Sequence, residues 1–178
     1  MNRIIRGTLV VSIALLAVGC MTAPRVFADA DEEGENAPGL LPQVTAAKVT
    51  LEQGLAAAES SGKPLSAKFE IEDGKLQLSV YTKKDNKYFE VVVDHETGAV
   101  SKTEEIKGGN DLRAAQRQSR AMAKAKISLR QAVEKSVAAS AGAKAIRASA
   151  YTSRKGHAMA DIDIVVGGKA KEAPQRLD

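Results

Sequence analysis

The sequence predicts an α+β protein with two small lobes, each a capped helix packed on an antiparallel β-meander. The first observation is a helix start that occurs twice, at residues 49–55 and 127–133. Each copy has an apolar residue, a hydroxyl residue, a leucine, and a glutamine three positions after the hydroxyl. The second observation is that alternating apolar and polar residues, typical of strands with one buried face, follow each start. An internal repeat of this kind favours two lobes of one design over a single larger domain.

The first lobe, residues 44–107, begins with the helix. Thr50 is a good N-cap, and Gln53 can return a hydrogen bond to the cap amide, so the two predict a capping box. Leu51 and Leu55 fall on one face of this helix and are expected to be buried.

Three strands follow the helix, connected by two tight turns. Asp73-Gly74 is a two-residue hairpin loop of a strongly preferred type, and a second turn centres on Asp85-Asn86. Folding about these turns brings each apolar residue opposite another apolar residue. The expected pairs are Ile71 with Leu76, Phe69 with Leu78, Ala67 with Val80, Val80 with Val91, and Leu78 with Val93.

A turn at residues 94–98 ends the third strand. Asp94 can accept hydrogen bonds from amides two or three residues further on, in a turn that includes Thr97. Gly98 supplies a positive φ without steric cost. Residues 99–106 are expected to form a short edge strand.

Residues 108–126 are predicted to be a basic helical connector. Their helix propensity is high, but they hold few large apolar side chains, so we expect the helix to have almost nothing to bury. Arg113, Arg117, Arg120 and Lys124 recur at three- and four-residue spacing and form a cationic stripe. A solvated connector is one interpretation. Docking on an acidic partner, on the acidic first lobe or on anionic lipid is the other.

The second lobe, residues 127–178, repeats the helix and a hairpin. In the first strand of this hairpin Ile146, Ala148 and Ala150 alternate with polar residues. A three-residue loop at residues 154–156 brings the apolar faces together. That register places Asp163 across from Arg147 as an ion pair on the outer face. Residues 169–177 form the last strand, where Pro174 indicates an edge.

The chain begins with an export signal in residues 1–28. Two arginines precede an apolar run at residues 9–18, which is too short for an ordinary membrane-spanning helix of about 20 residues. Two processing sites compete: cleavage after Ala28, or a lipobox-like pattern in which Cys20 carries a lipid. The exported protein is then soluble in the periplasm or lipid-anchored in the cell envelope. Residues 29–43 are acidic and rich in Gly and Pro, which predicts a disordered tether.

Charge is distributed unevenly along the chain, although the whole sequence carries a net charge of only +4. Residues 29–110 hold 9 basic and 16 acidic residues, and residues 111–178 hold 14 basic and 6 acidic residues. This polarity argues against generic nucleic-acid binding by the whole chain, and it permits attraction between lobes or between chains.

The first lobe resembles the PepSY domain, which has a cystatin-like arrangement of a helix on a meander. The matching features are the helix of residues 49–59, the strand of residues 88–93, and Asp94, Thr97 and Gly98 in the turn that closes it. The second copy keeps the helix start and the hairpin but lacks this turn. The resemblance implies an exported, non-catalytic domain of the kind found in propeptides of secreted metallopeptidases and in small envelope proteins. It implies no cofactor, and its suggested partner is a peptidase on a separate chain.

Catalytic and metal-binding interpretations are weighed at a few residues. His95 lies between two acids, but three consecutive turn residues cannot converge on one metal ion without help from elsewhere. His157 is expected on the surface beside a hairpin loop. Asp161 and Asp163 share a strand face, and alternation together with Arg147 explains them without catalysis.

The leading hypothesis is therefore a tandem PepSY-like envelope protein that binds or restrains another protein and catalyses no reaction. We expect no catalytic, cofactor or metal site and no nucleic-acid partner. Membrane contact is expected only through the signal peptide or a lipid on Cys20. A structural or small-ligand-binding envelope module is the alternative, which a large apolar cavity would favour.

Overall fold

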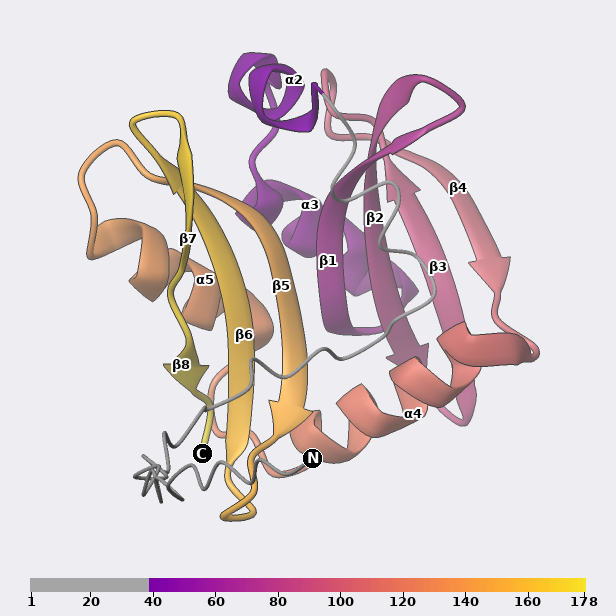
Figure 1. The fold of residues 1–178 in the computed structure, drawn as a ribbon. Helices are drawn as coiled ribbons and strands as arrows, with labels where there is room; N and C mark the ends of the chain where they lie inside the picture. The colour runs from indigo at the N-terminus through magenta and orange to yellow at the C-terminus, as the bar shows by residue number, and fades with distance from the viewer. Residues whose placement is uncertain (1–38) are drawn as a thin grey trace, which may run out of the picture.

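The structure, a computed structural model, describes residues 39–178 as an α+β fold (Figure 1). The signal peptide, Cys20 and the tether up to residue 38 lie outside the described residues. The helices are α2 (Leu40–Ala46), α3 (Leu51–Ala58), the short 3₁₀ helix η1 (Glu59–Ser61), α4 (Gly109–Met122) and α5 (Leu129–Ala138). The strands are β1 (Lys63–Glu72), β2 (Lys75–Lys84), β3 (Lys87–Val93), β4 (Val100–Glu105), β5 (Lys144–Thr152), β6 (Ala158–Val166), β7 (Lys169–Glu172) and β8 (Gln175–Arg176).

Both repeats belong to one antiparallel sheet. Within residues 39–178 the strand order is β4-β3-β2-β1-β5-β6-β7, and β8 also pairs with β6. The first strands of the two repeats, β1 and β5, are hydrogen-bonded neighbours at the centre of this order. The repeats are thus joined edge to edge through their backbones, and their division into two separate lobes stays a prediction.

The hairpin registers predicted from the sequence are confirmed. β1 and β2 pair Ile71 with Leu76 and Phe69 with Leu78, and β2 and β3 pair Val80 with Val91. The remaining expected pairs, Ala67 with Val80 and Leu78 with Val93, are also present. Turn chemistry and apolar alternation were sufficient here because they specify the same register.

The two helix starts form matching capping boxes. In α3 the Thr50 hydroxyl accepts a hydrogen bond from the Gln53 amide, and the Gln53 side chain accepts one from the Thr50 amide. In α5, Ser128 and Gln131 make the same two contacts. Each box satisfies two amides that the first turn of a helix leaves without intrahelical partners.

Helices α3 and α5 lie side by side on one face of the sheet (Figure 1). The apolar face of α3 packs on β1, β2 and β3, and that of α5 packs on β5, β6 and β8. Their buried residues join those of the sheet in one hydrophobic core that extends across both repeats. Its largest fully buried side chains include Phe69, Leu51, Leu55, Leu78, Leu129, Ile162, Ile164 and Leu177.

Helix α4 corrects the prediction of a connector with almost nothing to bury. It lies on the opposite face of the sheet from α3 and α5, across the end where β1 begins and β5 ends (Figure 1). Its residues Ala115, Ser119 and Met122 are buried between the helix and the sheet. Small side chains let a helix approach a sheet closely, so the shortage of large apolar residues did not imply a solvated helix.

Helix α2 corrects part of the tether prediction, because residues 40–43 are helical. Leu40 and Val44 lie one turn apart and are 4% and 3% exposed. This apolar pair anchors the helix against the top of the sheet, an interaction that the acidic, Gly- and Pro-rich composition of the preceding residues concealed.

The last predicted strand is divided into β7 and β8. Pro174 lacks an amide hydrogen, so it interrupts the ladder between them, while the Ala173 amide still donates to the Ile162 carbonyl at 2.7 Å. Edge position was predicted correctly for this segment; the break was not.

Candidate functional site

An open groove of about 590 Å³ lies where the two repeats meet. β1 and β5 pair only through Ser66, Ala67 and Lys68, and above these residues the strands separate (Figure 1). Helix α2 lies across the resulting gap. The groove is lined by Gly39, Leu40, Leu41 and Pro42 at the start of α2, by Phe69 of β1, by Ile146 and Arg147 of β5, by Asp163 of β6, and by Ala170, Lys171 and Glu172 of β7.

A β-bulge in β5 explains why the strands separate. The register with β6 shifts between Ala145 and Arg147, and Ala145 rather than Ile146 takes the core position. A bulge bends its strand and re-aims the adjacent side chain. The simple alternation predicted for Ile146 is therefore wrong: this side chain is half-buried and lines the groove. Lys144 secures α2 at this point by donating from Nζ to the Thr45 carbonyl at 2.7 Å.

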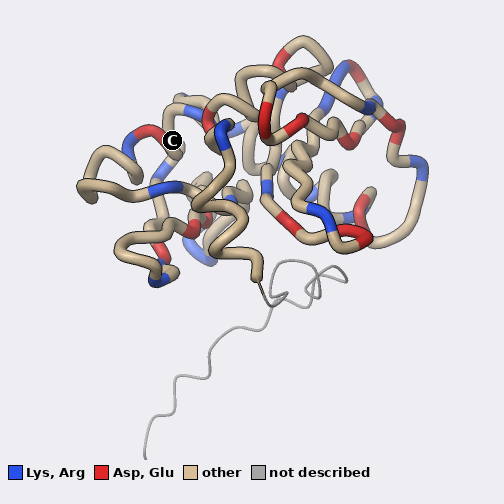
Figure 2. Tube along the Cα trace, turned by 90° about the horizontal axis from the view of Figure 1, so that it is seen from above, with Lys and Arg blue, Asp and Glu red and all other residues tan. Residues whose placement is uncertain are grey.

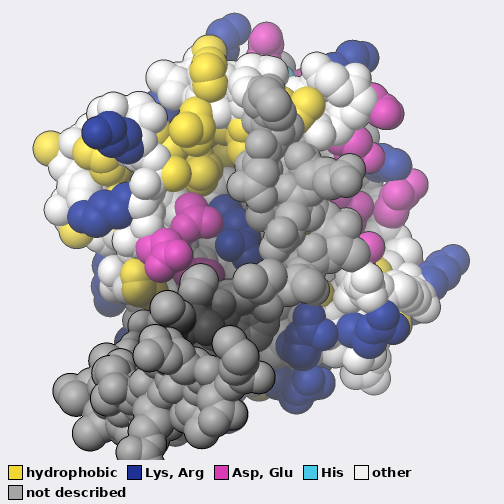
Figure 3. All heavy atoms as spheres, viewed as in Figure 1, with side chains coloured by type: hydrophobic (Ala, Val, Ile, Leu, Met, Phe, Trp, Pro, Cys, Tyr) yellow, Lys and Arg dark blue, Asp and Glu magenta, His cyan; other side chains and the backbone are white. Residues whose placement is uncertain are grey.

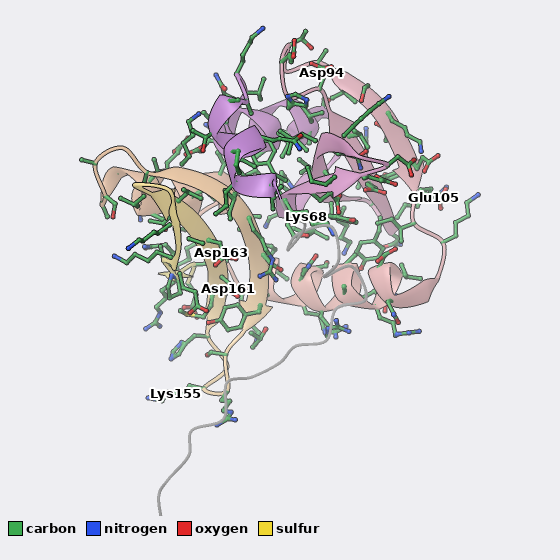
Figure 4. The ribbon with its side chains drawn as sticks, turned by 45° about the horizontal axis from the view of Figure 1, so that its top comes forward. Lys68, Asp94, Glu105, Lys155, Asp161 and Asp163 are labelled. Carbon is green, nitrogen blue, oxygen red and sulfur yellow. The ribbon has the colours of Figure 1, made fainter. Side chains whose placement is uncertain are left out.

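The charged side of the groove comes from three neighbouring strands. Arg147 Nη1 lies 3.5 Å from Asp163 Oδ2 and 3.9 Å from Asp161 Oδ2, and Glu172 of β7 stands directly opposite Asp163. The predicted register of Asp163 with Arg147 is confirmed. Asp161 and Asp163 lie together along β6 in Figure 4. Two carboxylates thus lie within 4 Å of the Arg147 guanidinium, and the third is the cross-strand neighbour of Asp163.

The electrostatics of Asp163 reflect its burial among charged groups of both signs, because Arg147 and Lys171 line the groove together with Asp163 and Glu172. Burial raises the pKa of its carboxyl above the usual value, and the carboxylates of Asp161 and Glu172 act in the same direction. Arg147 opposes this effect and lowers the pKa in part. Since a nearby cation favours the charged form of a carboxyl, a positive group from a partner placed beside Asp163 would be stabilised here.

Apolar and acidic surfaces adjoin one another along the groove. Figure 3 shows hydrophobic side chains gathered beside a group of acidic side chains on this face of the molecule. Among the lining residues Leu41, Pro42 and Ala170 are at least partly exposed, so they present apolar atoms to solvent. The groove therefore offers both a desolvating surface and a negative charge within one open depression.

The turn at residues 94–98 has the predicted hydrogen bonds. The Asp94 carboxylate accepts from the amides of Glu96 and Thr97 and from the Thr97 hydroxyl, at 2.7 to 3.0 Å. Those bonds lower the pKa of the Asp94 carboxyl, and the bond from the Thr97 amide has the largest effect. Gly98 has a φ of 77°. The His95 carbonyl then accepts from the amides of Lys48 and Val49, which fixes the chain just before α3.

Sequence reasoning missed the counterpart of this turn in the second repeat. There the Leu177 carbonyl accepts from the amides of Lys126 and Ile127, at 2.7 and 3.1 Å, just before α5. The C-terminal segment thus performs the anchoring that the turn performs in the first repeat. Isolated apolar Leu177 near the C-terminus was the available signal, and it is 1% exposed.

The cationic stripe lies on the outer side of α4. Arg113, Arg117, Arg120 and Lys124 are all exposed, and the helix packs on the sheet through its opposite side. Its role in binding stays a prediction. The charge polarity along the sequence does not give one wholly acidic and one wholly basic half, since residues of both signs occur over both repeats (Figure 2).

The histidines occupy structural positions. His95 is half-buried in the anchoring turn, and its Nδ1 is enclosed without a hydrogen-bond partner in the described part of the chain. His157 follows the predicted three-residue loop. A hydrogen bond from the Ser153 amide to the His157 carbonyl closes this loop, and Gly156 within it has a φ of 84°. Between residues 39 and 178 no group of three or more histidine, cysteine, aspartate or glutamate residues is placed to hold a metal ion.

No helix within residues 39–178 combines the length and the apolar character that crossing a bilayer requires. A lipid on Cys20 and the signal peptide concern residues that the structure does not describe. Comparison of the chain with protein-family models, with curated proteins and with solved structures finds no match.

Proposed function

We propose that this protein is an exported, non-catalytic binding protein that holds another protein through the groove at the junction of its two repeats. The observation that carries the proposal is the combination of an apolar side, from Leu41, Pro42 and Ile146, with a charged side on which the carboxylates of Asp163 and Glu172 lie among Arg147 and Lys171. This combination matches a polypeptide segment in which a lysine or arginine stands next to an apolar residue.

The electrostatics give such a segment a reason to bind. Asp163 is half-buried, the carboxylates of Asp161 and Glu172 raise its pKa together with burial, and Arg147 offsets this rise in part. A cationic side chain from a partner would add a charge-assisted hydrogen bond and would relieve the repulsion between carboxylates. The apolar neighbour would cover exposed atoms of α2 and contribute by burial.

The same geometry disfavours the small-ligand alternative. The core side chains Leu78 and Ile162 are fully buried, and the groove is an open depression that reaches this core only at Leu40 and Phe69. Small ligands are bound most often in concave sites that enclose most of their surface. An open groove on a sheet with a helix at its side suits a polypeptide better.

Restraint of a secreted peptidase is the specific form of this function that the PepSY resemblance suggests. The groove would hold a segment of the enzyme or of its propeptide on a separate chain. Addition of the purified protein to a panel of secreted metallopeptidases, with the rate of hydrolysis as the measurement, tests this form apart from binding itself.

Binding is tested with a fluorescent peptide in which one arginine is flanked by leucines. We expect saturable binding that weakens as salt is raised, because screening reduces the attraction. The double variant Asp163→Asn with Glu172→Gln should weaken it about tenfold or more, the loss expected for one charge-assisted hydrogen bond of about 1.5 to 3 kcal/mol. The change in fluorescence anisotropy measures both.

Asp73→Asn with Glu104→Gln is the matched control, because it removes two exposed carboxylates outside the groove. The control should bind the peptide with an affinity within about twofold of that of the unaltered protein. A peptide with glutamine in place of arginine should bind the unaltered protein as weakly as the arginine peptide binds the groove variant. Equal binding by the groove variant and the control, or no binding by the unaltered protein, would refute the proposal.

A further inference from the structure

The end of the molecule opposite the groove carries a cationic surface that the fold assembles from two distant segments. We define this surface as Arg113, Arg117, Arg120, Lys124, Arg154 and Lys155. Arg113, Arg117 and Arg120 lie on α4, Lys124 lies two residues beyond its end, and the last two lie in the loop between β5 and β6. All six are exposed.

The stripe on α4 is presented outward by the packing of the helix. Ala115, Ser119 and Met122 are buried against the sheet, and the four basic residues recur on the other side at intervals of three and four. A helix of this length extends about 20 Å, so the stripe forms an elongated row of charge. Figure 3 shows basic side chains gathered over α4 at the lower right.

A hydrogen bond between segments extends the row beyond the helix. Lys124 Nζ donates to the Gly156 carbonyl at 3.2 Å, which brings the β5–β6 loop beside the end of α4. Arg154 and Lys155 stand in this loop, and Figure 4 shows Lys155 at the far tip of the hairpin. The sequence places these residues 30 positions from Lys124, so only the fold shows that they belong to one surface.

Few acids offset this charge. The chain has no acidic residue between Asp111 and Glu134, and none between Glu134 and Asp161. Asp178, near the same hairpin, is engaged by Arg176 at 2.7 Å. A concentration of like charge on one surface is costly unless opposite charge is nearby, so the surface is complementary to a polyanionic partner.

We propose that this cationic surface rests on the anionic headgroups of a membrane leaflet. The surface contains no aromatic side chain, so it lacks the stacking platforms by which proteins hold nucleic-acid bases. Its apolar neighbours Ala115 and Met122 face inward, so contact would be peripheral and reversible by salt. The apolar run at residues 9–18 is expected to bring the chain to a membrane during export.

The placement gives the groove a defined orientation. Helix α2 and the groove lie at one end of the sheet, and α4 and the β5–β6 loop lie at the other (Figure 1). A protein resting on lipid through the cationic surface would therefore hold the groove away from the membrane. The inference does not depend on what the groove binds.

Binding to vesicles tests the inference with protein that is cleaved after Ala28, made in every arm from a precursor carrying Cys20→Ala so that no lipid is attached. The unaltered surface should bind vesicles with about one third phosphatidylglycerol at low salt and release at high salt. It should not bind phosphatidylcholine vesicles. Each basic residue near an anionic surface contributes about a fivefold gain in partitioning. The variant with Arg113, Arg117, Arg120 and Lys124 changed to Gln should lose about a hundredfold or more in partitioning, and Arg154→Gln with Lys155→Gln about 25-fold.

A matched control changes Lys48, Lys75, Lys135 and Lys169 to Gln, which removes the same charge from exposed positions outside the surface. It should retain most of the binding. Equal loss in the control, or no binding to anionic vesicles by the unaltered surface at low salt, would overturn the proposal. Binding of a duplex or single-stranded oligonucleotide as tightly as the vesicles would overturn the choice of lipid. The salt series on the unaltered surface needs no substitution, so it decides the case even if the fourfold variant does not fold.

Discussion

The two repeats anchor their helices through the same contact but build it from different pieces of chain. In the first repeat the His95 carbonyl accepts two amides just before α3, and the carbonyl stands in an internal turn held by Asp94. In the second repeat the Leu177 carbonyl accepts two amides just before α5, and it stands one residue from the chain end. The anchor therefore belongs to the repeated fold, whereas the turn motif is one way of supplying it.

The cores of the repeats also differ in side-chain size. Phe69, Leu78 and Val91 fill the first, while alanines at 148, 150 and 160 contribute to the second. Leu177 is fully buried in the second repeat, whereas His95 in the first is half-buried. The second repeat thus obtains from Leu177 both an anchor and part of its core, which the first repeat obtains from separate elements.

The largest expected effect comes from Leu177→Ala, which keeps the anchoring carbonyl and removes the buried side chain. Loss of a buried leucine side chain costs about 2 to 5 kcal/mol in the free energy of unfolding. His95→Ala should cost less than about 1 kcal/mol, because a half-buried side chain makes no hydrogen bond there through Nδ1. Chemical denaturation measures both. Equal costs would show that the two anchors are equivalent in packing as well as in hydrogen bonding.

A smaller effect is expected where the helices touch the sheet. A Cβ on Gly54 would lie 2.4 Å from Leu78 Cδ2, and Leu78 is fully buried. Gly54→Ala should therefore destabilise the protein by about 1 to 3 kcal/mol through overpacking, despite the better helix propensity of alanine. At the equivalent position of α5, Ala132 is fully buried, so Ala132→Gly should cost about 1 kcal/mol or somewhat more.

These two substitutions exchange the residues of the repeats and so test how strictly each helix–sheet distance is set. Thermal unfolding of both variants, compared with that of the unaltered protein, gives the measurement. A stabilising Gly54→Ala would mean that Leu78 moves aside freely, and the close approach of α3 would then be incidental rather than required.

The sequence predicted the local parts of this architecture well. The pairing of Phe69 with Leu78 followed from turn chemistry and alternation, which act within a few residues. The capping boxes at Thr50 and Ser128 are likewise local. The confirmed contact of Arg147 with Asp163 required only the length of one loop.

The parts that were missed depend on contacts between distant segments. The pairing of β1 with β5 joins Ala67 to Ala148, and nothing in either strand specifies the other as its neighbour. The groove exists because this pairing stops after three residue pairs and because a bulge bends β5, so its lining set had no sequence signature. The burial of α4 depended on small residues such as Ala115, which a search for large apolar side chains passes over.

The smallest expected effect concerns acid, and it compares the carboxylates of Asp94 and Asp178, each of which adjoins the anchor of one repeat. Hydrogen bonds from Thr97 and Glu96 lower the pKa of Asp94, and the Arg176 side chain, with smaller contributions from His157 and the Ala158 amide, lowers that of Asp178 to about 2. Both folded values lie below the ordinary 3.8. Each group therefore adds stability at pH values above about 4, and this contribution is lost as the pH falls through the folded value.

Asp178→Asn and Asp94→Asn should each reduce the fall in the free energy of unfolding between about pH 4 and pH 2. The two reductions should add, because the two carboxylates lie in different repeats. Side-chain carboxyl ¹³C shifts followed by NMR give the midpoints directly, and unfolding at several pH values gives the linkage. A midpoint near 3.8 for Asp178 would mean that its contacts with Arg176 and His157 do not persist in solution. The second repeat would then be closed by Leu177 alone, and only the first would use a carboxylate to hold its anchor.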